Sequence, residues 1–421
     1  MKIKPISKTY YKLLEFILFF PTHISSGIGY YYHFDKNEYK DKPIIVIGDH
    51  ASHKLVINMF AGVDFKCVNV IMSYLRGREP LYHFTSGISN SSIYMKQISN
   101  DPAPVKQMLD VLRQKGSLFL LPEGRFSYDG STNPVRRSVA KFLKAAGVDV
   151  IICNSYGAYL QNPYFNETPR KGKQEYHYRP LFSAGDLKRM SADEIYDELM
   201  KRLSYNDYEW NRTVQNSYLS GGRNAEGLEN LLYYCPRCGS EFKMKGYGSD
   251  FICENCGNTV HLNDKYEFSL PDEKSAMPYL DISEWYADQR RRVRNEVKKP
   301  DFSISYECEM WTIDENRKSA DFDRQSEGVL VLNSRGMTYT PKTDKSEGLF
   351  VPANEILSFY ADIEKGVKKN FMFYRDRYVD FRPISEKNRI IKYMLAAEEL
   401  RNLYHQDWVW EKHTDMEKEV M

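Results

Sequence analysis

Four cysteines in two closely spaced pairs are the strongest chemical signal in the sequence. Cys235 and Cys238 form the first pair, fourteen residues follow, and Cys253 and Cys256 form the second. Four thiolates satisfy the tetrahedral preference of Zn²⁺ and leave no coordination position open for a substrate. A glycine follows each pair and permits a tight turn. We therefore predict a structural Zn²⁺ site. Two disulfides are the alternative, and a reducing compartment disfavours them.

A second group of reactive side chains follows two apolar runs. His50 and Ser52 come directly after the run Ile44–Gly48, and Glu123, Arg125 and Ser127 come after a run that ends near Leu121. An imidazole is a suitable general base for an acceptor hydroxyl. A guanidinium can hold an anionic headgroup by charge-assisted hydrogen bonds, and a carboxylate can orient that guanidinium or the hydroxyl. This set could hold an anionic molecule and activate one of its hydroxyl groups.

Alternating strands and helices are expected to position these residues. Buried strands are predicted within the segments 44–60, 116–127 and 147–157, each with turn or helical sequence beside it. Such alternation indicates an α/β domain with a mostly parallel sheet and flanking helices. Functional groups in such a fold lie on the loops at the carboxyl ends of the strands. Both groups of residues that follow the apolar runs would therefore lie at the same edge of one sheet.

Block order and spacing within residues 10–180 resemble the glycerophospholipid acyltransferases of the PlsC type, the 1-acyl-glycerol-3-phosphate acyltransferase family. The first block of that family reads Asn-His-x-Ser-x-x-Asp, and a later block carries Pro-Glu-Gly. The resemblance implies that His50 is the general base. It also implies that the substrate-binding positions are Lys96, Glu123, Gly124, Arg125 and Ser127. The acyl donor would be acyl-CoA or acyl-carrier protein, and the acceptor a lysophospholipid-like hydroxyl.

One position departs from the family pattern. Leu55 stands where the first block carries its Asp, and leucine can neither fix the tautomer of the imidazole nor support its positive charge. Asp49 and His53 are the nearby candidates for a replacement partner, although neither has the family's spacing. The alternative reading is therefore a non-catalytic lipid-binding or scaffold protein on the same fold.

Four segments are expected along the chain. An acyltransferase-like α/β domain is predicted at 1–215, a zinc ribbon at 229–265 and a charged connecting helix at 281–299, in which Arg290 to Arg294 form a solvated face. Alternating strands and a final helix at 303–408 resemble a PH/GRAM-like domain, a small antiparallel β-barrel capped by a helix.

Charge and hydropathy favour a protein that works at a membrane surface. Residues 1–180 hold 24 Lys and Arg against 14 Asp and Glu, a net charge of +10, whereas the remainder holds 35 against 43, a net charge of −8. A basic front half suits an anionic partner. The aromatic segment Tyr10–Phe20 is too short to span a bilayer and could lie at the headgroups or in the core.

The odd number of cysteines, seven, and the lack of a secretory signal pattern favour the cytoplasm, with peripheral membrane association. Nucleic acid is not expected as a partner, because the predicted ribbon carries three basic and three acidic residues around its cysteines rather than a basic face.

Overall fold

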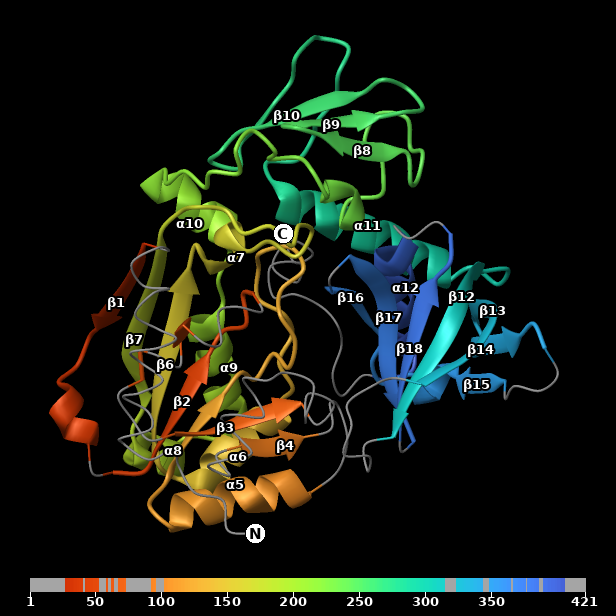
Figure 1. Ribbon diagram of the computed structural model, residues 1–421. Helices are drawn as coiled ribbons and strands as arrows, with labels where there is room; N and C mark the ends of the chain where they lie inside the picture. The colour runs from red at the N-terminus through yellow and green to blue at the C-terminus, as the bar shows by residue number, and fades with distance from the viewer. Residues whose placement is uncertain are drawn as a thin grey trace. The chain divides into compact units, whose positions relative to one another are not determined.

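The chain divides into two units in the computed structural model (Figure 1). Unit 1 comprises residues 1–162 and 171–216, and unit 2 comprises residues 163–170 and 217–421. The structure describes residues 27–40, 42–52, 58–59, 62–63, 67–72, 92–95, 102–314, 323–343, 348–364, 366–375, 377–385 and 389–405.

A seven-stranded sheet in the order β1-β7-β6-β2-β5-β3-β4 forms unit 1. Only the pairing of β6 with β7 is antiparallel; the other neighbours in this sheet are parallel. The mostly parallel α/β sheet predicted from the sequence is thus confirmed. The strands are β1 (Ile28–Tyr32), β2 (Ile44–Gly48), β3 (Cys67–Met72), β4 (Ser92–Met95), β5 (Ser117–Leu120), β6 (Asp149–Tyr156) and β7 (Gln174–Phe182).

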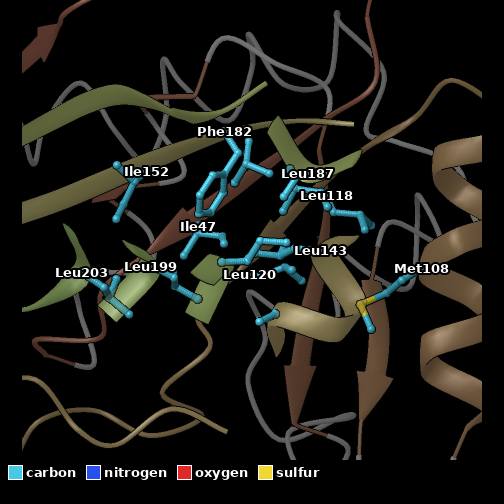
Figure 2. Close-up of a cluster of buried hydrophobic side chains, with 14 of the residues drawn as sticks. Ile47, Met108, Leu118, Leu120, Leu143, Ile152, Phe182, Leu187, Leu199 and Leu203 are labelled. Carbon is cyan, nitrogen blue, oxygen red and sulfur yellow. The ribbon is translucent and has the colours of Figure 1, made fainter. Parts of the chain in front are cut away.

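Strand β2 lies between β5 and β6 at the middle of the sheet, and all five of its residues are buried. Its continuous apolar sequence is typical of a parallel strand covered on both faces. Ile47 and Ile152 from the strands pack with Met108, Leu143 and Leu199 from the helices (Figure 2). Burial of this cluster fixes the strand ends, and therefore the residues that follow them.

Short helices complete unit 1, and two begin with capping boxes in which a serine and an acidic side chain satisfy each other's backbone N–H groups. None of the helices in the described part of the chain is long and apolar enough to cross a bilayer. The helical segments of unit 1 are η2 (Lys36–Tyr39), α5 (Ala103–Arg113), α6 (Ser138–Ala146), α7 (Ala158–Gln161), α8 (Ala184–Arg189), α9 (Ala192–Leu203) and α10 (Asp207–Val214).

Unit 2 begins with a small antiparallel sheet in the order β11-β10-β9-β8, which carries the four clustered cysteines. Its segments are η5 (Leu228–Asn230), β8 (Met244–Tyr247), β9 (Asp250–Cys253), β10 (Thr259–Leu262) and β11 (Phe268–Ser269). Helix α11 (Ile282–Val297) follows, with Asp281 as its N-cap. Gln289 of α11 accepts the N–H groups of Tyr233 and Tyr234 and donates to the carbonyl of Leu231, so the helix and the first cysteine turn form one body.

A second antiparallel sheet, in the order β15-β14-β13-β12-β18-β17-β16, completes unit 2. Helix α12 (Ile390–Asn402) packs on this sheet and is almost entirely buried, which confirms the predicted antiparallel sheet with a final helix. The PH/GRAM-like identity and the four domain boundaries stay predictions. The remaining segments are β12 (Ser303–Asp314), β13 (Asp323–Asn333), β14 (Gly336–Pro341), β15 (Leu349–Pro352), η6 (Ala353–Glu355), β16 (Tyr360–Glu364), β17 (Val367–Tyr374) and β18 (Arg377–Pro383).

Residues 163–170 leave unit 1 and pack within unit 2 before the chain returns at residue 171. Arg170 holds this segment: its Nη2 donates to the carbonyl of Asn224 at 2.7 Å, and its guanidinium lies 4.4 Å from the centroid of the Tyr266 ring. Asn230 also donates to the carbonyl of Phe165 at 2.9 Å. The continuous domain predicted at 1–215 did not anticipate this excursion.

The sequence-based expectation of a solvated basic face on α11 holds for Arg291 and Arg292, which are exposed, but not for Arg290 and Arg294. Arg290 is 2% exposed, and its guanidinium pairs with Glu398 at 2.6 Å and Glu399 at 3.0 Å, both buried on α12. Arg294 also pairs with Glu399, at 2.9 Å. The acidic partners lie more than a hundred residues further along the chain, so the local pattern of α11 carried no sign of them.

We expect Arg290→Leu to reduce the free energy of unfolding by about 3–5 kcal/mol, because it removes the guanidinium that pairs with buried Glu398 and one of the two guanidiniums that pair with Glu399. The measurement is urea denaturation followed by tryptophan fluorescence. Arg291→Leu is the matched control: this neighbouring side chain is 54% exposed and pairs with Asp288, so its loss should cost less than about 1 kcal/mol. Equal losses in the two variants would show that the buried pairing contributes nothing particular.

Candidate active site and metal centre

The structure brings the turn after β2 together with the loop after β5. His50 lies two residues beyond the end of β2, and Glu123 lies three residues beyond the end of β5. The backbone N–H of His50 donates to Glu123 Oε1 at 2.8 Å, and the N–H of Ser127 donates to the His50 carbonyl at 2.8 Å. These bonds fix the position of the His50 backbone relative to both ends of the loop.

Both carboxylate oxygens of Glu123 accept backbone N–H groups. Oε1 binds His50, as above, and Oε2 accepts the N–H of Asn133 at 2.6 Å. The side chain is 5% exposed. Charge-assisted hydrogen bonds of this kind are about twice as strong as neutral ones, and they compensate for the burial of the charge. Glu123 is thus a crosslink between two turns, and its contact with substrate stays a prediction.

The Arg125 side chain is buried and contacts other residues of its own loop. The residue is 3% exposed, its Nε donates to Asn133 Oδ1 at 3.2 Å, and its guanidinium lies 4.8 Å from the centroid of the Tyr128 ring. Gly124 adopts φ +68°, a left-handed conformation that side chains disfavour, although a Cβ there would meet no atom within 4 Å. Backbone conformation, not space, therefore favours glycine between Glu123 and Arg125.

The rest of the loop is buried and attached to a segment that sequence analysis did not single out. Ser127 Oγ donates to the Ser131 carbonyl at 2.6 Å. The N–H of Asp207 donates to the Gly130 carbonyl at 3.0 Å, and the N–H of Tyr205 donates to Thr132 Oγ1 at 2.6 Å. Residues 205–207 therefore hold the loop in place through the hydrogen bonds of their backbone N–H groups. No motif marks them, because their role consists of backbone contacts that are remote in sequence.

Two carboxyl groups behind the site are completely buried. Asp207 accepts the N–H groups of Gly157 at 3.1 Å and Tyr159 at 2.9 Å, and Asp49 accepts the N–H and the hydroxyl of Ser155 at 2.5 and 2.6 Å. Burial raises the pKa of each carboxyl group to about 7, and the hydrogen bonds offset only part of this effect.

The hydrogen bonds described so far involve the backbone of His50 rather than its imidazole. In the described part of the chain, the hydrogen bonds of the Asp49 carboxylate run to Ser155 and to the backbone of its own turn, not to the ring of His50. The imidazole lies edge-on to the Phe126 ring, with a centroid distance of 6.2 Å. Lys96, Leu55, His53 and the segment Tyr10–Phe20 lie outside the described residues.

The four cysteines of unit 2 form a single cluster. Their sulfur atoms all lie within 4.8 Å of one another, and the Cys235–Cys256 and Cys238–Cys253 pairs are each 3.8 Å apart. A disulfide would require about 2.05 Å, whereas sulfurs bound at about 2.3 Å to one tetrahedral ion lie about 3.8 Å apart. Hydrogen bonding, first of all from Ser240, lowers the pKa of the Cys238 thiol to about 5, whereas burial raises the pKa of the Cys235 and Cys256 thiols. The cluster could hold one metal ion and has no place for a fifth protein ligand among the described residues.

We expect Glu123→Gln to destabilise the protein by about 1–3 kcal/mol, because the new amide must turn its own N–H₂ toward one of two buried backbone donors. Chemical denaturation of both forms measures the difference. Glu209→Gln, at an exposed position of α10, is the matched control and should change stability by less than about 0.5 kcal/mol. If Glu123→Gln proved equally neutral, the crosslink would not hold the turns together.

Comparisons with known proteins gave similarities among solved structures. No protein-family model matches the sequence. No curated protein matches it. Among solved structures, the fold is similar to that of the 1-acyl-sn-glycerophosphate (LPA) acyltransferase PlsC from Thermotoga maritima, with a TM-score of 0.36 and 18% identity, over 46% of this chain and 76% of that chain.

Proposed function

We propose that the protein is a membrane-peripheral O-acyltransferase that moves a fatty acyl group from an acyl thioester to a hydroxyl of a lysophospholipid-like acceptor. The observation that carries the proposal is the pair of hydrogen bonds that joins the His50 turn to the loop of Glu123 and Ser127. Two segments that are 73 residues apart, and that the family resemblance assigns to one site, therefore meet at the same edge of the sheet.

In the proposed reaction, the imidazole of His50 removes the proton of the acceptor hydroxyl while the oxygen attacks the thioester carbonyl carbon. A tetrahedral intermediate forms and then collapses as the carbon–sulfur bond breaks. The thiolate leaves and recovers the proton from the imidazolium, so no further reactant is needed. Arg125 would contribute positive potential for an anionic headgroup, with Lys96 as a second predicted cation.

A non-catalytic lipid-binding or scaffold protein is the second candidate, and the sequence observation that favours it is Leu55 in place of the acidic motif residue. Leu55→Asp separates the two candidates when thioester consumption is measured. Activity in the native chain supports the acyltransferase, whereas inactivity of both forms supports the scaffold.

Replacement of His50 tests the proposed base directly. We expect His50→Ala to lower the transfer of labelled acyl groups from acyl-CoA to a panel of lysolipids by about 10²–10⁴-fold, while circular dichroism stays unchanged. His33→Ala, at an exposed position of the same unit, is the matched control and should keep full activity. Undiminished turnover in His50→Ala would remove this residue from the mechanism.

We further propose that the cysteine cluster binds one structural Zn²⁺, held by Cys235, Cys238, Cys253 and Cys256. When bound, the ion supplies folding free energy to unit 2 and takes no part in catalysis. The distances between the sulfur atoms and the absence of a fifth protein ligand in the described chain support this role.

Metal analysis checks the zinc proposal without any activity assay. We expect about one zinc ion per native chain, and a loss of most of it together with a lower unfolding midpoint in Cys253→Ser. Cys308→Ser, at a buried cysteine of unit 2 outside the cluster, should retain the metal. Metal-free protein whose intact mass shows two disulfides would contradict the proposal.

A further inference from the structure

The residue directly before the proposed base carries a buried carboxylate that forms no ion pair within the described part of the chain. Asp49 is 0% exposed, and no lysine, arginine or histidine in the described part of the chain forms an ion pair with it. Buried charges in proteins are normally paired, because an isolated charge in a low-dielectric interior is costly. The burial of the Asp49 carboxylate is therefore costly, and this cost suggests that the residue has a function.

We propose that Asp49 is a positioning residue for His50, whose buried negative charge stabilises the imidazolium formed during acyl transfer in place of the acidic residue missing at position 55. The inference rests on the proposed function. The family pattern carries asparagine directly before its histidine and aspartate five residues after it, whereas this chain carries Asp49 and Leu55. In this chain the carboxylate therefore lies one residue before the histidine, whereas in the family pattern it lies five residues after it.

The geometry supports action through charge rather than through a direct hydrogen bond. Asp49 directly precedes His50 in the chain, and Ser155 on β6 holds both oxygens of its carboxylate in place. We expect the negative charge of the adjacent residue to stabilise a positive charge that forms on His50.

The other titratable groups near Asp49 do not neutralise it. The negative charge of Asp49 contributes to raising the pKa of five groups, none of which can carry a positive charge. They are Cys153, Tyr156, Tyr176, Tyr205 and Asp207. Among the described residues, Arg179 is a cation that acts on Cys153 and Tyr156. Burial raises the pKa of Asp49 to about 7, so its charge is present only from neutral pH upward.

Asp49→Asn removes the charge and can keep both hydrogen bonds. The amide oxygen can accept the N–H of Ser155, and the amide N–H₂ can donate to the Ser155 hydroxyl, which accepts equally well. Ser155→Ala is the complementary variant: it keeps the carboxylate but removes a hydrogen bond that favours the ionised form, so the pKa of Asp49 rises further.

The test compares pH profiles of acyl transfer from labelled acyl-CoA. For Asp49→Asn we expect a fall in kcat of about 10–100-fold, little change in the KM of the acceptor, and no recovery at alkaline pH. For Ser155→Ala we expect low activity at pH 7 that recovers as the pH rises and Asp49 ionises. Asp193→Asn, an exposed carboxylate of the same unit that pairs with Arg137, controls for net charge and should match the native profile.

NMR titration of labelled histidine provides a readout that does not depend on turnover. The His50 signal is assigned by its loss in His50→Ala, and we expect the pKa of His50 to fall in Asp49→Asn and to stay unchanged in Asp193→Asn. Native activity at Asp49→Asn, with His50→Ala inactive, would overturn the inference and leave the proposed function intact. If no His50-dependent transfer exists, the function fails, and an unchanged pKa of His50 in Asp49→Asn would overturn the inference separately.

Discussion

The carboxylate of Glu123 is the constraint on which the proposed site depends. It accepts one backbone N–H from the His50 turn and one from Asn133, so a single buried charge holds the ends of two loops. The parallel pairing of β2 with β5 makes this possible, because it places the carboxyl ends of both strands at one edge. The supporting layer is equally specific: residues 205–207 bind the loop through backbone contacts, and Asp207 in turn holds the start of α7.

Buried charge is treated differently in the two units. In unit 2, Arg290 lies between two glutamates of α12, and the pairing joins α11 to the helix of the C-terminal sheet. In unit 1, Asp49 is equally buried, and its carboxylate accepts hydrogen bonds from Ser155 and from the backbone of its own turn. The first arrangement is the usual solution to burying a charge, whereas the second leaves the carboxylate without an ion pair in the described part of the chain. The adjacent residue is His50, and this contrast makes the location of Asp49 chemically informative.

The sequence allowed the elements to be predicted better than their contacts. The apolar run of β2 and the period of the helices identify a mostly parallel sheet, and the spacing of four cysteines predicts a cluster that the structure confirms. The roles of Glu123 and Arg290 could not be predicted, because each depends on partners far along the chain. The packing of residues 163–170 within unit 2 could not be predicted for the same reason. Arg170 binds the carbonyl of Asn224, and no local pattern indicates such a contact.

The most direct test of the central claim is a crystal structure of the full chain with a lysophospholipid and a non-reactive thioether analogue of acyl-CoA. The account predicts that the acceptor hydroxyl lies about 2.6–3.2 Å from a ring nitrogen of His50, with the acyl carbon of the analogue next to that hydroxyl. Both ligands bound away from the turn that Glu123 holds, with the His50 ring facing neither of them, would contradict it.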